Sequence, residues 1–283
     1  MLVVAGASGH LGREVAETLL AHRAGDVRLV SRTPDRLADL AARGADVRHG
    51  DFDDPATLPD AFAGARRVLV VSTDALDRRV TQHREAISAA VRAGAEHVIY
   101  TSVVSPVPAN PAAVVETHRQ TEEDLRGAGC AWTILRNNLY AEFQAPEAEE
   151  AAASGRLVHN RGDGRAAYVS RTDCAAAAAA VLAGDGHAGQ AYDITGPESL
   201  GAADLAALYG ELAGRSVEAV AIGDEELVAA MAGEGADGHL VYGAQLVASF
   251  GRAIREGHFA AISDAVERLT GRAPRTLRQV LTA

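Results

Sequence analysis

The feature that most constrains the fold of this chain is the regular alternation of short apolar runs with amphipathic segments. In the first half of the 283 residues, six runs have the length and composition of buried strands, at 2–5, 27–31, 47–49, 67–71, 97–101 and 132–136. Segments with helical periodicity lie between them, at 11–22, 34–43, 55–63, 78–93 and 117–128. In the first of these, Leu11, Val15 and Leu19 form one apolar stripe. Strands and helices that alternate in this way predict an α/β fold of the Rossmann type, a doubly wound parallel sheet with helices on both faces.

The second half of the chain has a looser pattern. Helices are expected at 146–154, 172–183 and 203–213, and strands at 190–194 and 217–222. From Asp224 onward, the sequence predicts several helices, interrupted by the glycine-rich segment 233–238. We therefore expect an α/β domain over residues 1–138. Residues 139–283 are expected to supply the last strands of the sheet and a small, mostly helical region that covers a ligand cleft.

Composition narrows the classes of function and location. The formal net charge of -11 argues against general nucleic-acid binding, which requires a basic surface. The two cysteines, Cys130 and Cys174, do not suggest a disulfide framework, and no cluster of residues has the spacing of a metal site. The longest alanine-rich stretch, 175–183, is about half as long as a membrane span. The chain shows no signal segment, so a cytoplasmic protein without membrane attachment is expected.

A glycine-rich segment joins the first expected strand to the first expected helix. It reads Gly6-Ala7-Ser8-Gly9-His10-Leu11-Gly12, a GxxGxxG pattern. Glycines at such a turn let the backbone approach a pyrophosphate, and the helix start offers free N–H groups to the phosphates. The segment therefore predicts a dinucleotide site whose contacts are Gly6, Ser8, Gly9, His10, Leu11 and Gly12.

The end of the second strand indicates which dinucleotide is bound. An NAD site usually has Asp or Glu there to bind the ribose hydroxyls. This chain has Ser31 and Arg32 instead, and a guanidinium can bind a 2′-phosphate with two hydrogen bonds. NADPH is thus the expected cofactor. Arg13 is a second candidate cation for that phosphate, or alternatively a solvated helix residue.

Polar residues at the ends of the other strands extend the expected site, because ligands bind beyond the carboxyl ends of parallel strands. Asp51 follows the third strand, Ser72 and Thr73 end the fourth, and Thr101 ends the fifth. Each of these residue types is also common in turns and helix caps. Beside a nucleotide loop, they are expected to line the path from adenine to nicotinamide.

Several motifs occur in a fixed order along the chain, at Gly6–Gly12, 81–84, 100–102, His118 with Glu122, 135–138, 162–164, 171–173 and 269–277. This ordered set resembles the NmrA-like atypical short-chain dehydrogenase/reductases, with the NADPH-dependent quinone oxidoreductases of type 2 as the most similar branch. The motifs extend over nearly the whole chain.

The resemblance implies a Rossmann domain, a small C-terminal substrate-binding region, and NADPH bound between them. Carried over by position, Ser72, Thr73, residues 137–142 (with Asn137 and Asn138) and Arg171 would join Arg32 in lining the cofactor. Tyr140 is also a candidate contact for the substrate. Tyrosines at cleft edges are also commonly packing residues. Asn138 and Leu139 depart from the Gly and Trp of the related enzymes, which leaves the identity of the quinone open.

The chain contains no lysine. Most short-chain dehydrogenases use a YxxxK pair to protonate the reduced carbonyl oxygen, and that pair cannot exist here. His118 occupies the matching helix position as a candidate proton donor or ribose contact. The alternatives are a structural histidine and a capping partner of Glu122. A quinone tolerates the loss of a proton donor because its reduced anion is stabilised and can take a proton from solvent.

The leading hypothesis is therefore an NADPH-dependent oxidoreductase that transfers a hydride to a quinone or a quinone-like aromatic. A redox sensor that binds NADP without turnover is the alternative, as is a biosynthetic enone or ketone reductase on the same fold. The partner expected is a small molecule, and a homo-oligomer is compatible with the sequence but not specified by it.

Overall fold

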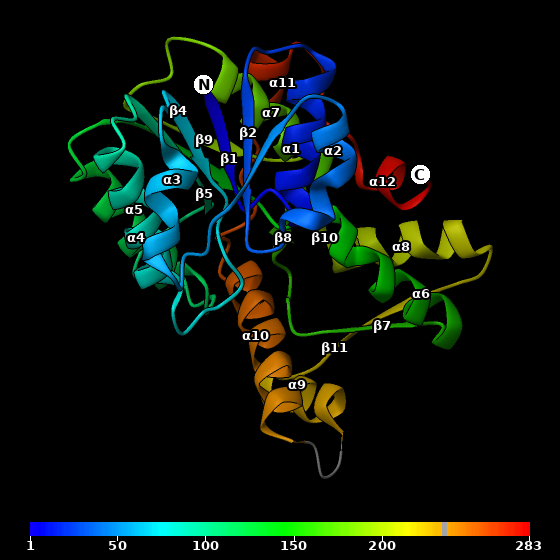
Figure 1. The fold of residues 1–283 in the computed structure, drawn as a ribbon. Helices are drawn as coiled ribbons and strands as arrows, with labels where there is room; N and C mark the ends of the chain where they lie inside the picture. Colours follow the sequence, from blue (N-terminus) through cyan, green and yellow to red (C-terminus); the bar gives the residue numbers. More distant parts are fainter. Residues whose placement is uncertain (234–236) are drawn as a thin grey trace.

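A seven-stranded parallel sheet forms the centre of the molecule in the computed structural model, which describes residues 1–233 and 237–283 (Figure 1). The strand order is β3-β2-β1-β4-β5-β6-β9, and every neighbouring pair is parallel. The strands are β1 (Leu2–Ala5), β2 (Val27–Ser31), β3 (Asp46–His49), β4 (Arg67–Val70), β5 (His97–Val103), β6 (Ala131–Asn137) and β9 (Gln190–Ile194). The order reverses between β1 and β4, and a doubly wound fold binds its ligand at this point. The predicted fold class is confirmed.

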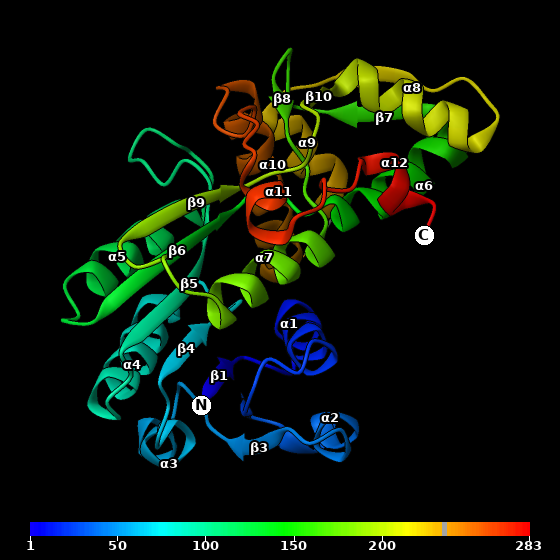
Figure 2. The same cartoon turned by 90° about the horizontal axis from the view of Figure 1, so that it is seen from above.

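Helices cover both faces of the sheet (Figure 2). One face carries α1 (His10–Ala21), α2 (Ala38–Ala42), α7 (Arg171–Ala183) and α11 (Ala265–Thr270). The other carries α3 (Leu58–Phe62), α4 (Arg79–Arg92) and α5 (Val115–Arg126). Two short 3-10 helices, η1 (Pro34–Leu37) and η2 (Pro55–Thr57), precede α2 and α3, so the expected helices at 34–43 and 55–63 are each divided in two.

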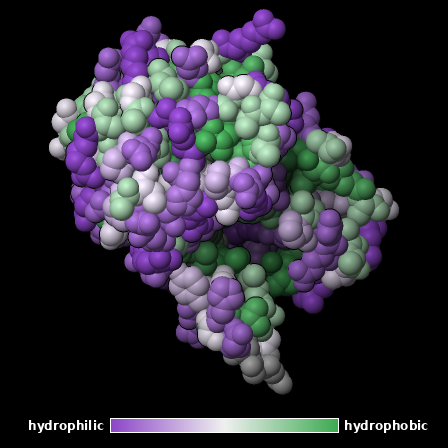
Figure 3. Space-filling model, in the orientation of Figure 1, coloured by the Kyte–Doolittle hydropathy of each residue, from purple (hydrophilic) through white to green (hydrophobic). Residues whose placement is uncertain are grey.

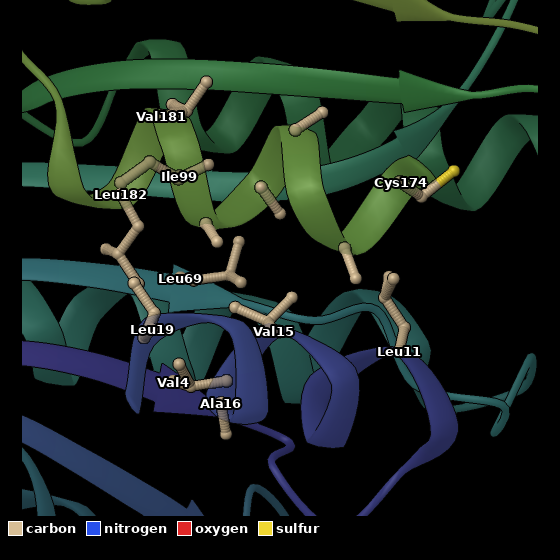
Figure 4. Close-up of a cluster of buried hydrophobic side chains, with 14 of the residues drawn as sticks. Val4, Leu11, Val15, Ala16, Leu19, Leu69, Ile99, Cys174, Val181 and Leu182 are labelled. Atoms are coloured by element: carbon tan, nitrogen blue, oxygen red, sulfur yellow. The ribbon is translucent and has the colours of Figure 1, made fainter. Parts of the chain in front are cut away.

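The expected apolar stripe of the first helix packs against α7 and the sheet. Leu11, Val15 and Leu19 are buried, and in Figure 4 they lie with Val4 and Leu69 beneath α7. The alanine-rich sequence of α7 lets the two helices approach closely, because alanine adds little bulk between them. This packing holds the start of α1, and therefore the glycine-rich segment, in a fixed position at the carboxyl end of β1.

After Asn137 the chain alternates between the main body and a smaller region. The smaller region contains η3 (Ala141–Phe143), α6 (Gln144–Ser154), β7 (Arg156–His159), β8 (Arg165–Ala166), β10 (Leu200–Gly201), α8 (Ala202–Ala213), β11 (Glu218–Ala221) and α12 (Leu277–Leu281). The expected strand at 217–222 does form, as β11, but it pairs with β7 in a separate two-stranded sheet. The second half therefore contributes one strand, β9, to the central sheet and not several.

Two further helices, α9 (Asp224–Ala232) and α10 (Gly238–Arg255), pack on each other and project from the body as an arm (Figure 1). The surface is hollowed between this arm and the α/β body, and hydrophobic residues are visible within the hollow (Figure 3). Part of the glycine-rich segment predicted at 233–238 lies outside the described residues. No described helix is both long enough and apolar enough to cross a membrane.

Candidate functional site

The glycine-rich segment forms a tight turn between β1 and α1. Gly6 has a φ of +88°, a conformation that other residues rarely adopt. A Cβ on Gly12 would lie 2.3 Å from the carbonyl oxygen of Gly6, so only glycine fits there. Gly9 has an ordinary φ of -76°, and a Cβ on it would meet only the Gly6 oxygen, at 3.5 Å. The packing of the protein therefore does not require a glycine at position 9. A glycine there keeps the space outside the turn open, where a pyrophosphate would approach.

The start of α1 has free hydrogen-bond donors. Gly9 occupies the N-cap position without a side-chain cap, and the first turn has no acidic residue. The N–H groups of His10, Leu11 and Gly12 find no acceptor among the described residues. His10 is exposed, whereas Leu11 is buried in the core. The free N–H groups and the positive end of the helix dipole form a site for an anion such as a pyrophosphate.

Arg32 lies directly beside this turn. The Ser31 hydroxyl donates a 2.7 Å hydrogen bond to the Ser8 oxygen and accepts one from the Thr33 N–H, which ties the end of β2 to the turn. Arg32 is exposed and forms no ion pair with any described residue. Arg13 differs, because its guanidinium binds Asp39 and Glu17. Of these two candidate cations, Arg32 is the one whose charge is available to a 2′-phosphate.

The loop after β4 is fixed by residues of β5 and α4. The Ser72 N–H donates to the Thr101 hydroxyl at 2.9 Å, and that hydroxyl donates to the Ser72 side chain at 3.3 Å. The Thr73 N–H donates to Nε2 of His83 at 3.0 Å, and the Thr73 hydroxyl donates to Gln82 at 2.6 Å. Burial and the nearby Arg79 lower the pKa of His83 to about 3, so the ring is neutral and can accept. The motif at 81–84 thus acts here as a support for the strand end.

Asp51 lies further along the same edge of the sheet. Its carboxylate accepts the Asp53 N–H at 3.0 Å, and its own N–H donates to the Thr57 hydroxyl. These bonds are those of a turn residue. The side chain is half-buried, so a contact with the adenine end of a nucleotide stays a prediction.

His118 lies in the interior, against a strand. Its Nδ1 is 2.7 Å from the Tyr100 hydroxyl, and both side chains are buried. Burial and the charge of Arg79 hold the pKa of His118 well below its ordinary value, so the imidazole is neutral. Burial also raises the pKa of Tyr100. Tyr100 appeared in the sequence only within an expected strand and the motif 100–102, and nothing in the local pattern indicated this partner.

Glu122 is not the partner of His118. Its carboxylate accepts hydrogen bonds from Ser102 at 2.7 Å and from Arg126 and Arg136 at 2.8 Å. Although burial alone would raise the pKa of Glu122, these donors lower it. The cluster ties α5 to strands β5 and β6, which is a structural role.

A second group of predicted residues gathers at the end of β6. Nδ2 of Asn137 donates to the Tyr140 hydroxyl at 3.1 Å, and the Arg171 guanidinium lies over the rings of Tyr140 and Phe143 at 5.2 and 4.9 Å. The Arg171 N–H donates to Oε1 of Glu142, whose Oε2 is buried and has no partner among the described residues. The structure therefore brings Asn137, Tyr140 and Arg171 together. The unpaired oxygen of Glu142 adds a polar position to this group, at the end of the stretch 137–142 that the resemblance assigned to the cofactor.

Asn138 faces a different part of the molecule. Its Nδ2 donates to the Phe259 carbonyl at 3.0 Å, and its Oδ1 accepts the Leu139 N–H at 2.8 Å. Both polar atoms of the buried amide are thus engaged, and the Nδ2 bond joins the end of β6 to the C-terminal segment. A cofactor contact by Asn138 has no support in this geometry and stays only a prediction.

The parts of the site fit a dinucleotide. The reversed strand order, the glycine turn that a Cβ would fill, the uncapped helix start and the free Arg32 together define a Rossmann protein that binds a phosphorylated dinucleotide. Within the described ranges, no group of three or more His, Cys, Asp or Glu side chains could hold a metal ion.

The chain belongs to the NAD(P)H-binding family, whose model matches residues 6–185. It is 33% identical to quinone oxidoreductase 2 of Escherichia coli over 82% of this chain and 81% of that protein. It is 30% identical to an NAD(P)H azoreductase of Xenophilus azovorans over 100% and 97% of the two chains. The predicted family resemblance and the nucleotide cofactor are confirmed.

Solved structures give the same result at the level of the fold. The E. coli NADPH-dependent quinone oxidoreductase complexed with NADPH superposes with a TM-score of 0.94 at 30% identity, over 100% of this chain and 99% of that one. The NADP(H) complex of the Citrobacter sp. triphenylmethane reductase has a TM-score of 0.92 at 29% identity, over 100% and 99%. The negative transcriptional regulator Nmra, at 17% identity, shares the fold alone.

Proposed function

We propose that this oxidoreductase uses NADPH to reduce quinones or quinone-like aromatics. The observation that carries the proposal is the full-length superposition on an NADPH-bound quinone oxidoreductase, together with the free Arg32 beside the phosphate-binding turn. The name of the azoreductase relative extends the candidate acceptors to azo compounds. When bound, NADPH would supply a hydride to the acceptor.

The chain's own residues would hold the nucleotide at three places. The N–H groups at the start of α1 would bind the pyrophosphate, and Arg32 would bind the 2′-phosphate. Ser72 and Thr73, whose positions are fixed by Thr101 and His83, would flank the nicotinamide half. Asn137, Tyr140 and Arg171 would close the site from the β6 side.

In residues 1–233 and 237–283, no side chain is arranged as a proton donor of the YxxxK kind. The chain lacks lysine, and His118 is a buried, neutral ring bonded to Tyr100. A quinone that receives a hydride becomes a hydroquinone monoanion, which takes one proton from water. An isolated ketone would become an alkoxide and would need an acid during the transfer. We therefore favour quinones over isolated ketones as acceptors.

Steady oxidation of NADPH with a panel of neutral quinones tests the proposal. Turnover with quinones, and none with simple ketones, is the expected result. Tight binding of NADPH without oxidation by any quinone, azo compound or enone would favour a redox sensor instead. Cell fractionation and light scattering would test the cytoplasmic location and the oligomeric state, which stay predictions.

A further inference from the structure

Arg79, the first residue of α4, is a buried cation that has no carboxylate partner among the residues that the structure describes. Four arginines in the described part of the chain are buried, and Arg79, at 6% exposure, is the most enclosed of them. The other three, Arg28, Arg67 and Arg161, each form an ion pair. Because an unpaired buried charge is costly, folded proteins seldom keep one without a function.

The hydrogen bonds of Arg79 fix its position without neutralising it. Nε donates to the Thr73 carbonyl at 2.7 Å, and Nη1 donates to the Thr117 hydroxyl at 3.2 Å. Nη2 donates to no described group. This nitrogen is also not fully enclosed by the protein. The small exposure of the residue therefore leaves one N–H group of the guanidinium accessible.

Arg79 lies at the carboxyl end of the sheet, bonded to the loop after β4. Thr73 belongs to the loop after β4, next to the point where the strand order reverses. Burial lowers the pKa of Arg79, and Tyr100, Asp74 and Tyr242 of α10 oppose this shift, so these three groups lie within electrostatic range of the guanidinium. Of these, Asp74 is exposed and forms no ion pair with Arg79. The neighbouring imidazoles of His83 and His118 are neutral.

We infer that Arg79 binds the oxygen, or the azo nitrogen, that becomes negatively charged when the acceptor is reduced. This inference rests on the proposed function. A hydride added to a neutral quinone creates an oxyanion, and a fixed cation in a site of low polarity stabilises such charge without reorganising. The site would then need no proton donor, which accounts for a reductase of this kind without lysine.

The same charge sets substrate specificity. Triphenylmethane dyes are cations that a hydride converts into neutral products, so they lose charge where quinones gain it. A buried guanidinium repels such a dye, and the repulsion falls away only as the dye is reduced. This chain should therefore prefer neutral quinones and azo compounds, although a triphenylmethane reductase is among its relatives.

The test compares Arg79→Gln and Arg79→Lys with Arg78→Gln as the matched control. Arg78 is the exposed neighbour and pairs with Asp53. We expect Arg79→Gln to lower kcat/KM for 1,4-benzoquinone by about ten- to a hundredfold, since a hydrogen bond to a charged group is lost. Activity with the cationic dye crystal violet should hold or rise. Arg79→Lys should restore part of the quinone activity, and Arg78→Gln should behave like the parent.

Binding of 4-nitrophenolate, a coloured oxyanion, tests Arg79 without turnover. The parent should bind the anion at least tenfold more tightly than Arg79→Gln, while NADPH affinity and circular dichroism stay the same. Equal losses for quinone and dye would overturn the inference, as would unchanged nitrophenolate binding or a loss confined to NADPH affinity. If the parent reduces no quinone, the proposed function fails, and the nitrophenolate comparison still decides whether Arg79 is an anion site.

Discussion

At the scale of single residues, the availability of each charge decides its role. Arg13 and Arg32 both lie near the phosphate-binding turn, but Arg13 is held by Asp39 and Glu17 while Arg32 is free among the described residues. Arg32→Asp should weaken NADPH binding by about 1.5–3 kcal/mol, or one to two decades, because the carboxylate also repels the phosphate. Dissociation constants for NADPH and NADH, measured by calorimetry, check this. Arg43→Asp, an exposed change of the same charge, controls for net charge. A parent protein that binds NADH as tightly as NADPH would contradict the assignment.

The pair of Tyr100 and His118 gives a second prediction at this scale. His118→Ala leaves the buried Tyr100 hydroxyl without its 2.7 Å partner, so unfolding free energy should fall by about 1–3 kcal/mol. General acid catalysis is worth about two to four decades in rate, so a structural histidine predicts a much smaller loss. Single-turnover NADPH oxidation with a quinone, corrected for nucleotide affinity, should slow by less than a hundredfold.

A mutant cycle separates the two roles of His118. Tyr100→Phe removes the same hydrogen bond from the other side, so the double variant should cost less stability than the sum of the two single changes. Urea unfolding measures the free energies of unfolding of the parent, the two single variants and the double variant. A thousandfold slower hydride step in a variant of unchanged stability would instead make His118 the essential acid.

At the scale of elements, the unit of β1, the glycine turn and α1 carries the clearest prediction. Gly9 has an ordinary φ, and an added side chain would meet no tight protein contact. Gly9→Val should therefore fold normally but obstruct the approach of a pyrophosphate, with loss of NADPH binding. Gly12→Val is the contrast, because its Cβ would lie 2.3 Å from the Gly6 oxygen and should disrupt folding itself. Circular dichroism and calorimetry distinguish the two, and a folded Gly9→Val that binds NADPH normally would refute the loop assignment.

The same scale shows what sequence patterns can predict. Strands such as 67–71 are continuous apolar runs because both faces of a parallel sheet are buried, and their ends were predicted to within two residues. Short strands at sheet margins lack this signal. In β7, only Leu157 and His159 are buried, so Arg156–His159 does not stand out from a loop. The strands β8 and β10, which the sequence pattern did not predict, have two residues each, too few for any periodicity.

The residues of the candidate site also divide into those that sequence patterns predict and those that they do not. The phosphate-binding turn is local in sequence, so the glycine spacing together with its position between a strand and a helix predicted it. Arg79, by contrast, differs from an ordinary helix arginine only through its enclosure by Thr73 and Thr117, which come from separate segments. Pairing of Tyr100 with His118 likewise depends on how α5 lies on β5. Such roles follow from tertiary packing, which sequence periodicity does not report.

At the scale of the whole molecule, one carboxylate joins the α9–α10 arm to the rest of the smaller region. Asp224, at the start of α9, accepts hydrogen bonds from Arg252 and Asn160 at 2.8 Å and from Arg255 at 3.0 Å. Asn160 lies on the loop after β7 and also donates to the Ala248 carbonyl of α10. The network thus connects both helices of the arm to the adjacent loop.

This network should make the attachment of the arm sensitive to acid. The hydrogen bonds from Arg255, the largest effect, together with those from Asn160 and Arg252, hold the pKa of Asp224 below its ordinary value of 3.8. Its carboxylate therefore stabilises the folded arm fully above about pH 4, and this stabilisation is lost as the pH falls through the lower pKa of the folded state. Asp224→Asn should weaken the attachment by about 1–3 kcal/mol already at neutral pH.

Hydrogen exchange followed by mass spectrometry, corrected for intrinsic rates, would resolve the arm from the sheet. We expect peptides from α9 and α10 to lose protection below about pH 4 while β1, β4 and β5 stay protected, since the sheet strands are buried on both faces. In Asp224→Asn the arm should exchange faster at pH 7 and show little further change with acid. Glu225→Gln, an exposed neighbour in the same turn, should follow the parent. Simultaneous loss of protection in arm and sheet would mean that Asp224 supports the whole fold, and an unchanged acid response in Asp224→Asn would assign the sensitivity to another carboxylate.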